Sequence, residues 1–289
     1  MSLRFLFLLI ALILSGCGGG SDFPPTVSVI KGQTLQFGKP AVIYVGGQYL
    51  RQDMVVNTTG CTNPAFRSDS TSNLAVLTCN ITAVGDFGVT LKSASGNLLY
   101  ATTLTVPLPQ VAMVTPLGNI IMELQADVVP TTVKNFLSYV SSGYYVSTLI
   151  HRVEPGFVIQ GGGYTAGMVK KPGQLDPIVL ESNKGLSNTR GTVAMARLGD
   201  NNSGSPEELS RSENSATSEF YFNLVDNLSL DYQSNAKKGY AVFGNVLQGL
   251  DVMDKIASVP TGPYTSSAGQ SFLNVPVNDV PITLMLQTK

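Results

Sequence analysis

The sequence predicts a mainly β protein with two domains, and three observations support this prediction. The chain has 289 residues, of which 43% are hydrophobic and 13% are charged, so it can bury the cores of two domains. Residues 26–106 alternate short β-forming runs with turn residues and show no helical period. The junction Pro107-Leu108-Pro109 is stiff, because each proline fixes its own φ and restricts the residue before it. We therefore expect a linker at residues 107–109 and a second domain over residues 110–289.

Residues 1–16 have the pattern of an export signal, with a positive start and an apolar segment too short to span a bilayer comfortably. The segment ends in Leu14-Ser15-Gly16-Cys17, which resembles the bacterial lipobox. That resemblance implies cleavage before Cys17 and lipid attachment to its thiol, followed by a tether over residues 17–25. It also places the protein on the periplasmic face of a bacterial membrane, with the outer membrane favoured over the inner. An ordinary signal peptide that ends near a cysteine is the alternative.

Residues 26–106 predict a small β-sandwich, immunoglobulin-like in broad character, because six or seven short strands in about eighty residues are typical of that fold. The expected strands are residues 26–30, 34–37, 41–45, 74–78, 87–91 and 98–106. In an exported protein the pair Cys61 and Cys79 most simply forms a disulfide, with two free thiols as the alternative. Such a bond would staple residues 57–73, which we expect to be irregular. We expect a spacer role for this domain rather than partner binding.

Residues 110–289 predict further strands and two helices. The expected elements are a hairpin of residues 111–115 and 120–125, a helix of about 130–142, a shorter helix of 250–258 and a closing strand of 282–286. The longer helix has Pro130 in its first turn and Gly143 at the position of a left-handed cap. Its apolar residues at helical spacing are Val133, Phe136, Leu137 and Val140. We expect this helix to be scaffold.

The stretch from His151 to Gly163 carries the clearest functional signal, because it reads as two short strands folded about a Pro-Gly turn. The guanidinium of Arg152, the amide of Gln160 and an apolar wall would then be held in fixed relation on a rigid sheet. This set suits the binding of a peptide bond. It does not suit acid–base catalysis, because His151 is the only histidine of the chain.

Composition and spacing exclude two other kinds of site. The net charge is −1 and the chain has no cluster of Lys and Arg, so we expect no nucleic-acid partner. The cysteines lack Cys-x-x-Cys spacing and have no histidine near them in the sequence, so we expect no metal or redox site.

Four blocks in order resemble the cyclophilin-type peptidylprolyl isomerases: residues 151–163, 188–197, 215–223 and 239–246. The resemblance covers about residues 110–287 and is greatest to the bacterial periplasmic branch. It implies an eight-stranded antiparallel β-barrel capped by a helix at each end. It also implies cis–trans isomerisation of X-Pro bonds in exported proteins, proline-containing polypeptides as partners, and no metal or organic cofactor. We expect a monomer.

The resemblance implies roles for residues that match the family's motifs. Arg152 matches the arginine that donates to the prolyl nitrogen, and Gln160 matches the glutamine that holds the substrate backbone and supports that arginine. The residues that match the proline-ring pocket are Phe157, Val158, Tyr221 and Leu230, and the residues that match the backbone pairing with the substrate are Ala196 and Arg197. Glu219 and Tyr240 are expected beside them. We assign His151 to structure.

Four positions depart from the family's pattern: Glu219 stands for Gln, Tyr221 for Phe, Ser229 for an aromatic and Tyr240 for His. Glu219 could pair with Arg152 or Arg197, restraining the former, or favour basic substrates; the sequence does not decide. Glu219 and Ser229 motivate a rival hypothesis, a catalytically weak module that binds proline peptides as a scaffold or chaperone. Residues 199–214 form a long acidic loop, which either borders the groove or is a solvated insertion.

Overall fold

The computed structural model describes residues 23–199 and 205–289. The predicted signal segment of residues 1–16, the predicted lipidation site Cys17 and most of the predicted tether lie outside the described residues. None of the helices in the described part of the chain has the length and apolar character needed to cross a membrane.

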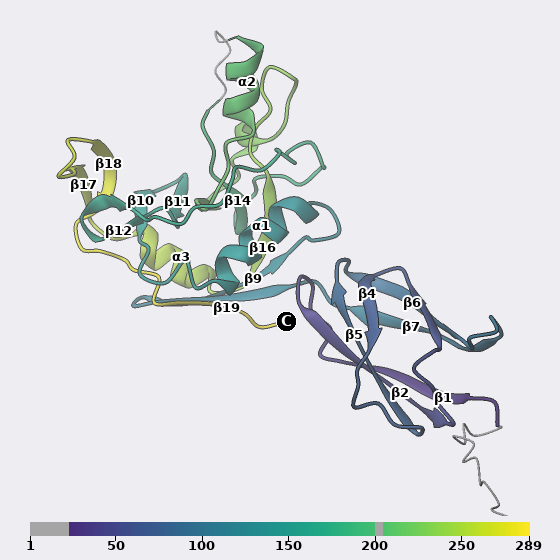
Figure 1. The fold of residues 1–289 in the computed structure, drawn as a ribbon. Helices are drawn as coiled ribbons and strands as arrows, with labels where there is room; N and C mark the ends of the chain where they lie inside the picture. Colours follow the sequence, from purple (N-terminus) through teal and green to yellow (C-terminus); the bar gives the residue numbers. More distant parts are fainter. Residues whose placement is uncertain (1–22, 200–204) are drawn as a thin grey trace, which may run out of the picture.

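The first group of strands forms two antiparallel sheets (Figure 1). The four-stranded sheet has the order β1-β2-β5-β4 and the three-stranded sheet has the order β3-β6-β7. Their bounds are β1 Thr26–Gln33, β2 Pro40–Gln48, β3 Val55–Thr58, β4 Cys61–Phe66, β5 Leu74–Ile81, β6 Gly85–Lys92 and β7 Leu98–Val106. β1 contacts β7 and β3 contacts β4 across the two sheets. Both sheets bury apolar side chains, among them Ile43, Leu77 and Leu91.

Two sequence predictions for this group are wrong. Residues 34–37 form no strand: Thr34 has a φ of 38°, and the apolar Phe37 is buried from the turn that leads to β2. Residues 57–73 are not irregular, because they contain part of β3 and all of β4. The side chains of β4 are mostly exposed and its pairing with β5 contains a bulge, so it lacks the apolar alternation that identifies a strand in a sequence.

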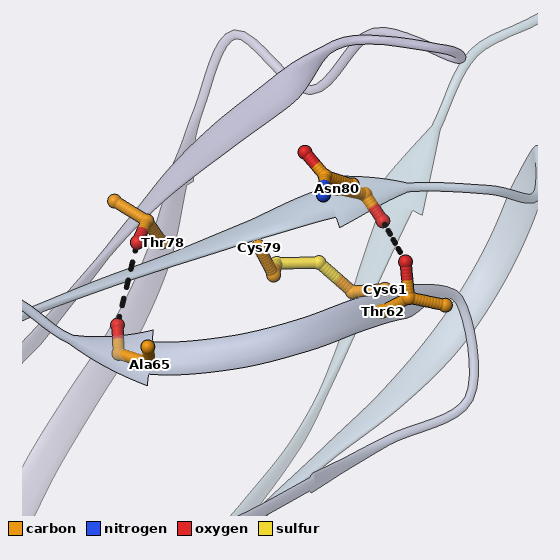
Figure 2. The surroundings of a disulfide bond; sticks show 6 residues. All are labelled: Cys61, Thr62, Ala65, Thr78, Cys79 and Asn80. Carbon is orange, nitrogen blue, oxygen red and sulfur yellow. Dashed lines mark hydrogen bonds between the residues drawn. A yellow bond between two sulfur atoms is a disulfide. The ribbon is translucent and has the colours of Figure 1, made fainter.

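The predicted disulfide between Cys61 and Cys79 is confirmed, and it joins the neighbouring strands β4 and β5 (Figure 2). The two Cα atoms are 5.7 Å apart and both cysteines are buried. Two side-chain hydrogen bonds of 3.4 Å join the same strands on either side of it. The disulfide therefore fastens an edge strand that buries little apolar surface of its own.

The second group is an eight-stranded antiparallel sheet with the order β10-β11-β15-β14-β16-β9-β8-β19. Its bounds are β8 Gln110–Thr115, β9 Gly118–Leu124, β10 Ile150–Glu154, β11 Val158–Gly161, β14 Thr192–Met195, β15 Phe220–Asn223, β16 Val242–Gln248 and β19 Leu284–Gln287. The sheet curls back on itself, because a bridge between Leu149 and Pro281 joins the segments that lead into β10 and β19. The Ile150 N–H also donates to the Val280 carbonyl at 2.9 Å. This curled sheet is the barrel that the resemblance implies.

Helix α1, Pro130–Ser141, and helix α3, Leu250–Ala257, form where the sequence predicts them. Gly143 has a φ of 70°, as the predicted left-handed cap requires. Phe136 of α1 contacts the rings of Tyr145, Phe220 and Phe243 inside the barrel. The buried apolar residues of α3 are Val252, Met253 and Ile256. Both helices therefore complete the apolar core.

Several smaller elements were not predicted. They are β12 Tyr164–Thr165, β13 Val169–Lys170, the 3-10 turns η1 Ala166–Met168 and η2 Leu228–Leu230, helix α2 Pro206–Glu213, and the hairpin of β17 Thr261–Thr265 and β18 Ser271–Pro276. The β17–β18 hairpin contacts β10. Helix α2 begins with a capping box between Ser205 and Glu208, a spacing that is visible in the sequence.

Candidate active site

One row of cross-strand neighbours builds the base of the site. The register pairs Arg152 on β10 with Gln160 on β11, and Gln160 with Tyr221 on β15. Ala194 on β14 continues the row beside Tyr221. Cross-strand partners point to the same face of a sheet, whereas alternate residues such as Ile159 are fully buried in the barrel core. The row therefore lies on the outer face of the barrel.

Arg152 is held from two sides. Its Nη1 donates to Gln160 Oε1 at 3.3 Å, and its Nη2 forms an ion pair with Glu154 Oε2. The guanidinium also lies 5.7 Å from the centre of the Phe157 ring. The sequence analysis missed Glu154, although a residue two positions along a strand shares the face of Arg152. These contacts fix the donor while 36% of its side chain remains exposed.

One cavity of about 240 Å³ brings together nine of the ten predicted catalytic and substrate-binding residues. Its lining consists of Arg152, Phe157, Val158, Gln160, Ala196, Arg197, Tyr221, Leu230 and Tyr240. The tenth, Glu219, lines a neighbouring cavity of about 390 Å³. Gln160, Ala196 and Arg197 line both cavities. The two hollows thus form one continuous groove with an amide and an arginine between them.

The walls of the smaller cavity rest on a separate apolar cluster. Val158, Ala194, Tyr221 and Val242 are buried together, and the side chains packed against them include Phe157, Leu230 and Tyr240. The Arg197 guanidinium lies 4.9 Å from the centre of the Tyr240 ring, and this cation–π contact holds one wall. Such a pocket, apolar on most sides with one charged donor, suits a proline ring beside its amide.

The hydroxyl of Tyr221, which the family's usual Phe lacks, has a partner away from the cavity. It donates to Asn188 Oδ1 at 2.8 Å, and Asn188 Nδ2 donates to Asp231 Oδ1 at 2.8 Å. Burial, with smaller contributions from Tyr240 and Asp231, raises the pKa of Tyr221 well above its usual value. The hydroxyl therefore remains a donor and anchors the floor of the pocket. Asn188 lies in a block that the sequence analysis singled out, but its role became visible only in three dimensions.

Glu219 lies just before β15 and accepts hydrogen bonds from two residues of the central hairpin. Gln160 Nε2 donates to Glu219 Oε2 at 2.9 Å, and His151 Nε2 lies 3.3 Å from the same oxygen. Burial raises the pKa of Glu219, but these hydrogen bonds and the charges of His151 and Lys170 outweigh that effect and hold the pKa below its usual value. The carboxylate therefore reaches Arg152 through Gln160, not by the direct ion pair that we considered.

His151 is buried, as its assignment to structure requires, with 5% of its surface exposed. Its ring packs edge-on against Tyr164 with 4.8 Å between ring centres, and Tyr164 packs in turn against Phe272 of the β17–β18 hairpin. This hairpin therefore supports the back of the site.

Comparison with known proteins identifies the family. The family described as "Cyclophilin type peptidyl-prolyl cis-trans isomerase/CLD" matches residues 110–284. The chain belongs to this cyclophilin family. It is 47% identical over 154 residues to a peptidyl-prolyl cis-trans isomerase of Acinetobacter baylyi, covering 53% of this chain and 74% of that protein. It is 44% identical over 147 residues to peptidyl-prolyl cis-trans isomerase B of Escherichia coli, covering 50% of this chain and 82% of that protein.

A solved cyclophilin-type isomerase from Cryptosporidium parvum is also similar, with 21% identity and a TM-score of 0.46. The similarity covers 63% of this chain and 98% of that protein.

The insertion of this cyclophilin between β14 and β15 meets the groove only at its ends in the part that the structure describes. Leu198, Ser215 and Thr217 line the larger cavity. Helix α2 projects from the barrel in Figure 1, and its last residue, Glu213, pairs with Lys238 at 2.7 Å. Leu198, Ser215 and Thr217 flank residues 199–214, and none of the described residues of that loop lines either cavity. Helix α2 is exposed along most of its described length.

Ser229, the position where the family usually has an aromatic, is exposed on η2 next to Leu230. Leu230 lines the cavity and Ser229 does not. The pocket of this cyclophilin is therefore closed on that side by Leu230 and by the ring of Tyr240.

Proposed function

We propose that this peptidyl-prolyl cis-trans isomerase acts on exported polypeptides, binding X-Pro segments in the groove beside Arg152. The observation that carries the proposal is the single cavity lined by nine matching residues, with the Arg152 guanidinium fixed at its edge by Gln160 and Glu154. In this assignment Arg152 and Gln160 are catalytic, and the other residues that line the smaller cavity bind the substrate.

The chemistry requires no bond to break. Rotation about an X-Pro amide is opposed by a resonance barrier of about 18–20 kcal/mol. A catalyst needs only to bind the twisted amide better than either planar isomer. As the amide twists, the prolyl nitrogen regains its lone pair and becomes a better hydrogen-bond acceptor. A guanidinium fixed at the pocket edge donates to that nitrogen without reorganising, and therefore favours the twisted form.

Each part of the groove takes one part of the substrate. The smaller cavity takes the proline ring between Phe157, Tyr221 and Leu230. The backbone at Ala196 and Arg197, which follows β14, pairs with the residues before proline. The Gln160 NH₂ donates to the substrate carbonyl, and the same NH₂ also donates to Glu219. No metal or organic cofactor takes part in this scheme.

The site of action that we propose is the periplasmic face of a bacterial membrane, with the outer membrane favoured. Lipid attachment at Cys17 would give the anchor. Residues 26–106 would act as a spacer that holds the barrel away from the lipid surface, and the protein would act as a monomer. We expect the wild type to incorporate radiolabelled palmitate. The Cys17→Ala variant should lose this incorporation.

The experiment that tests the activity is the isomerisation rate of a Xaa-Pro peptide with protein that begins after Cys17, compared with the Ala196→Phe variant. Ala196 lines both cavities, so a phenyl ring there fills the groove. We expect the variant to lose at least about tenfold in kcat/KM, because steric exclusion of the substrate removes transition-state binding.

The matched control is Ala236→Phe, which adds the same ring at an exposed position and should leave the rate unchanged. Equal acceleration by the wild type and by Ala196→Phe would show that isomerisation does not take place in this groove. Peptide binding without acceleration by the wild type would favour the rival scaffold function.

A further inference from the structure

A chain of three polar contacts runs from the buried side of the site to the proposed catalytic arginine. His151 Nε2 lies 3.3 Å from Glu219 Oε2, Gln160 Nε2 donates to that oxygen at 2.9 Å, and Gln160 Oε1 accepts from Arg152 Nη1 at 3.3 Å. Gln160 therefore connects a carboxylate to a guanidinium. The Gln160 NH₂ faces an acceptor, the carboxylate, and Gln160 Oε1 faces a donor, the guanidinium.

This arrangement allows one orientation of the Gln160 amide. A carboxylate only accepts hydrogen bonds and a guanidinium only donates them. The Gln160 NH₂ must therefore point to Glu219, and its carbonyl oxygen must point to Arg152. A side chain without an acceptor at position 219 would leave this orientation unsupported, and a flipped Gln160 would present its NH₂ to the NH₂ groups of Arg152.

The structure holds Glu219 firmly in this place. Only 23% of its side chain is exposed, and its Cγ and carboxyl group lie over Gly163. A Cβ added at Gly163 would lie 2.5 Å from Glu219 Cγ, so the glycine leaves the space that the glutamate occupies. Among the described residues, His151 Nδ1 is buried without a hydrogen-bond partner. His151 Nε2, which faces Glu219 Oε2 at 3.3 Å, is therefore the ring nitrogen whose N–H the carboxylate accepts.

The surroundings of Glu219 fit a role in selecting basic substrates less well. Glu219 Oε2 already accepts from Gln160 and faces His151. The cavity that Glu219 lines is also lined by Lys170 and Arg197, so its charged lining is not predominantly negative. A basic substrate side chain would meet these cations as well as the carboxylate.

We propose that Glu219 is a positioning residue, which fixes the Gln160 amide and through it the Arg152 guanidinium. This inference rests on the proposed function, because it assigns Arg152 to the reaction. Glu219 itself does not contact the reacting amide. Its contribution is to hold the donor in one geometry before the substrate binds, which lowers the reorganisation needed in the twisted state.

The test compares Glu219→Gln with Glu219→Met, two substitutions of similar length. The glutamine side chain can still accept from Gln160 and His151, whereas the methionine side chain cannot. We expect Glu219→Gln to keep kcat within about threefold and Glu219→Met to lose about tenfold, with KM changed by less than about twofold in both. In a Gln160→Ala background, Glu219→Met should cost less than about twofold, because the intermediate link is already gone.

A second variant covers the case in which Glu219→Met disturbs folding. Gly163→Ala keeps the carboxylate but pushes it out of its place, and its backbone does not require glycine's positive φ. It should lower kcat like Glu219→Met. The proposal is overturned if both variants keep wild-type kcat, or if Glu219→Met costs the same tenfold with and without Gln160.

A measurement independent of activity separates this proposal from the function on which it rests. In ¹⁵N NMR spectra, the Gln160 side-chain NH₂ and Arg152 Nε–H signals should broaden or shift in Glu219→Met and stay close to wild type in Glu219→Gln. Unchanged signals in both variants would contradict the positioning role. An inactive wild type with these signal changes would instead contradict the proposed function alone.

Discussion

At the scale of single residues, the site depends on polar groups that are held by other polar groups. Arg152 has Gln160 and Glu154 as partners, Gln160 has Glu219, and Tyr221 has Asn188. Each of these side chains is partly or fully withdrawn from water, so an unmatched partner would carry a desolvation penalty. The polar side chains of the groove therefore satisfy one another in a single arrangement.

Glu219 should make stability depend on pH in acid. Its pKa in the folded protein lies below its ordinary value of 4.5, so its contribution to stability is present above the unfolded pKa and is lost as pH falls through the folded pKa. We expect urea unfolding between about pH 7 and about pH 3 to show a smaller loss of stability in Glu219→Gln than in the wild type.

The control for this series is Glu207→Gln, which removes a carboxylate at an exposed position of α2. It should keep the wild-type pH dependence. Identical pH dependence of unfolding in Glu219→Gln and the wild type would refute the electrostatic role assigned to Glu219.

At the scale of elements, helix α1 shows how a distant residue completes a helix. Its N-cap residue, Val129, has no side chain that can cap, and Glu181, far along the chain, takes this role. The Glu181 carboxylate accepts from the Thr132 N–H at 2.8 Å and from the Thr132 hydroxyl at 2.7 Å. A carboxylate at a helix N-terminus also matches the helix dipole.

We expect Glu181→Ala to lower the free energy of unfolding by about 1 kcal/mol, the usual cost of a lost N-cap. Glu181→Gln keeps one acceptor oxygen and should lose less. Urea unfolding of both variants measures the effect. A Glu181→Ala protein as stable as the wild type would show that α1 does not need this cap.

The sequence predicted elements best where the signal was local. The helices at Pro130 and Leu250 and the hairpin around Gly156 follow from periodicity, proline and glycine positions, and all three form. The strand at residues 34–37 was predicted because the apolar Phe37 is typical of a buried strand position. In the structure Phe37 is buried in the core from a turn. β4 was missed because its stability comes from pairing and a disulfide rather than from its own apolar residues.

The sequence predicted which residues form the site better than it predicted the contacts between them. The four blocks contain every residue that lines the smaller cavity except Leu230, which lies between the third block and the fourth. They could not show that Glu219 bonds Gln160, because strand register and the depth of burial decide that contact. The pair of Glu154 with Arg152 was overlooked, although the two residues share one face of the same strand.

The β17–β18 hairpin behind His151 also escaped the sequence analysis. The Ala268-Gly269 turn between two short β-forming runs could have predicted this hairpin.

At the scale of the whole molecule, the barrel contains every residue of the groove and closes on itself. The two edges of its sheet meet where the Ile150 N–H donates to the Val280 carbonyl at 2.9 Å. The first group of sheets contributes the Cys61–Cys79 disulfide and buried apolar residues such as Ile43, Leu77 and Leu91. The division into residues 26–106 and residues 110–289, with residues 107–109 as the linker, stays a prediction.

We expect residues 110–289 expressed alone to fold and to keep kcat/KM for a short peptide within about twofold of the longer protein, because function resides in the site and not in the neighbouring domain. Thermal unfolding and the peptide assay on both proteins test this. An insoluble fragment, or one that loses more than about tenfold in activity, would mean that the first group of sheets supports the site.

The measurement that tests the account most directly is NMR exchange between the cis and trans forms of an Ala-Pro peptide, with wild-type protein, Arg152→Ala and the exposed control Arg211→Ala. We predict rapid exchange with the wild type and with Arg211→Ala, and a loss of about 100-fold with Arg152→Ala while the peptide still binds. Exchange that persists at the wild-type rate in Arg152→Ala would contradict the claim that this guanidinium stabilises the twisted amide.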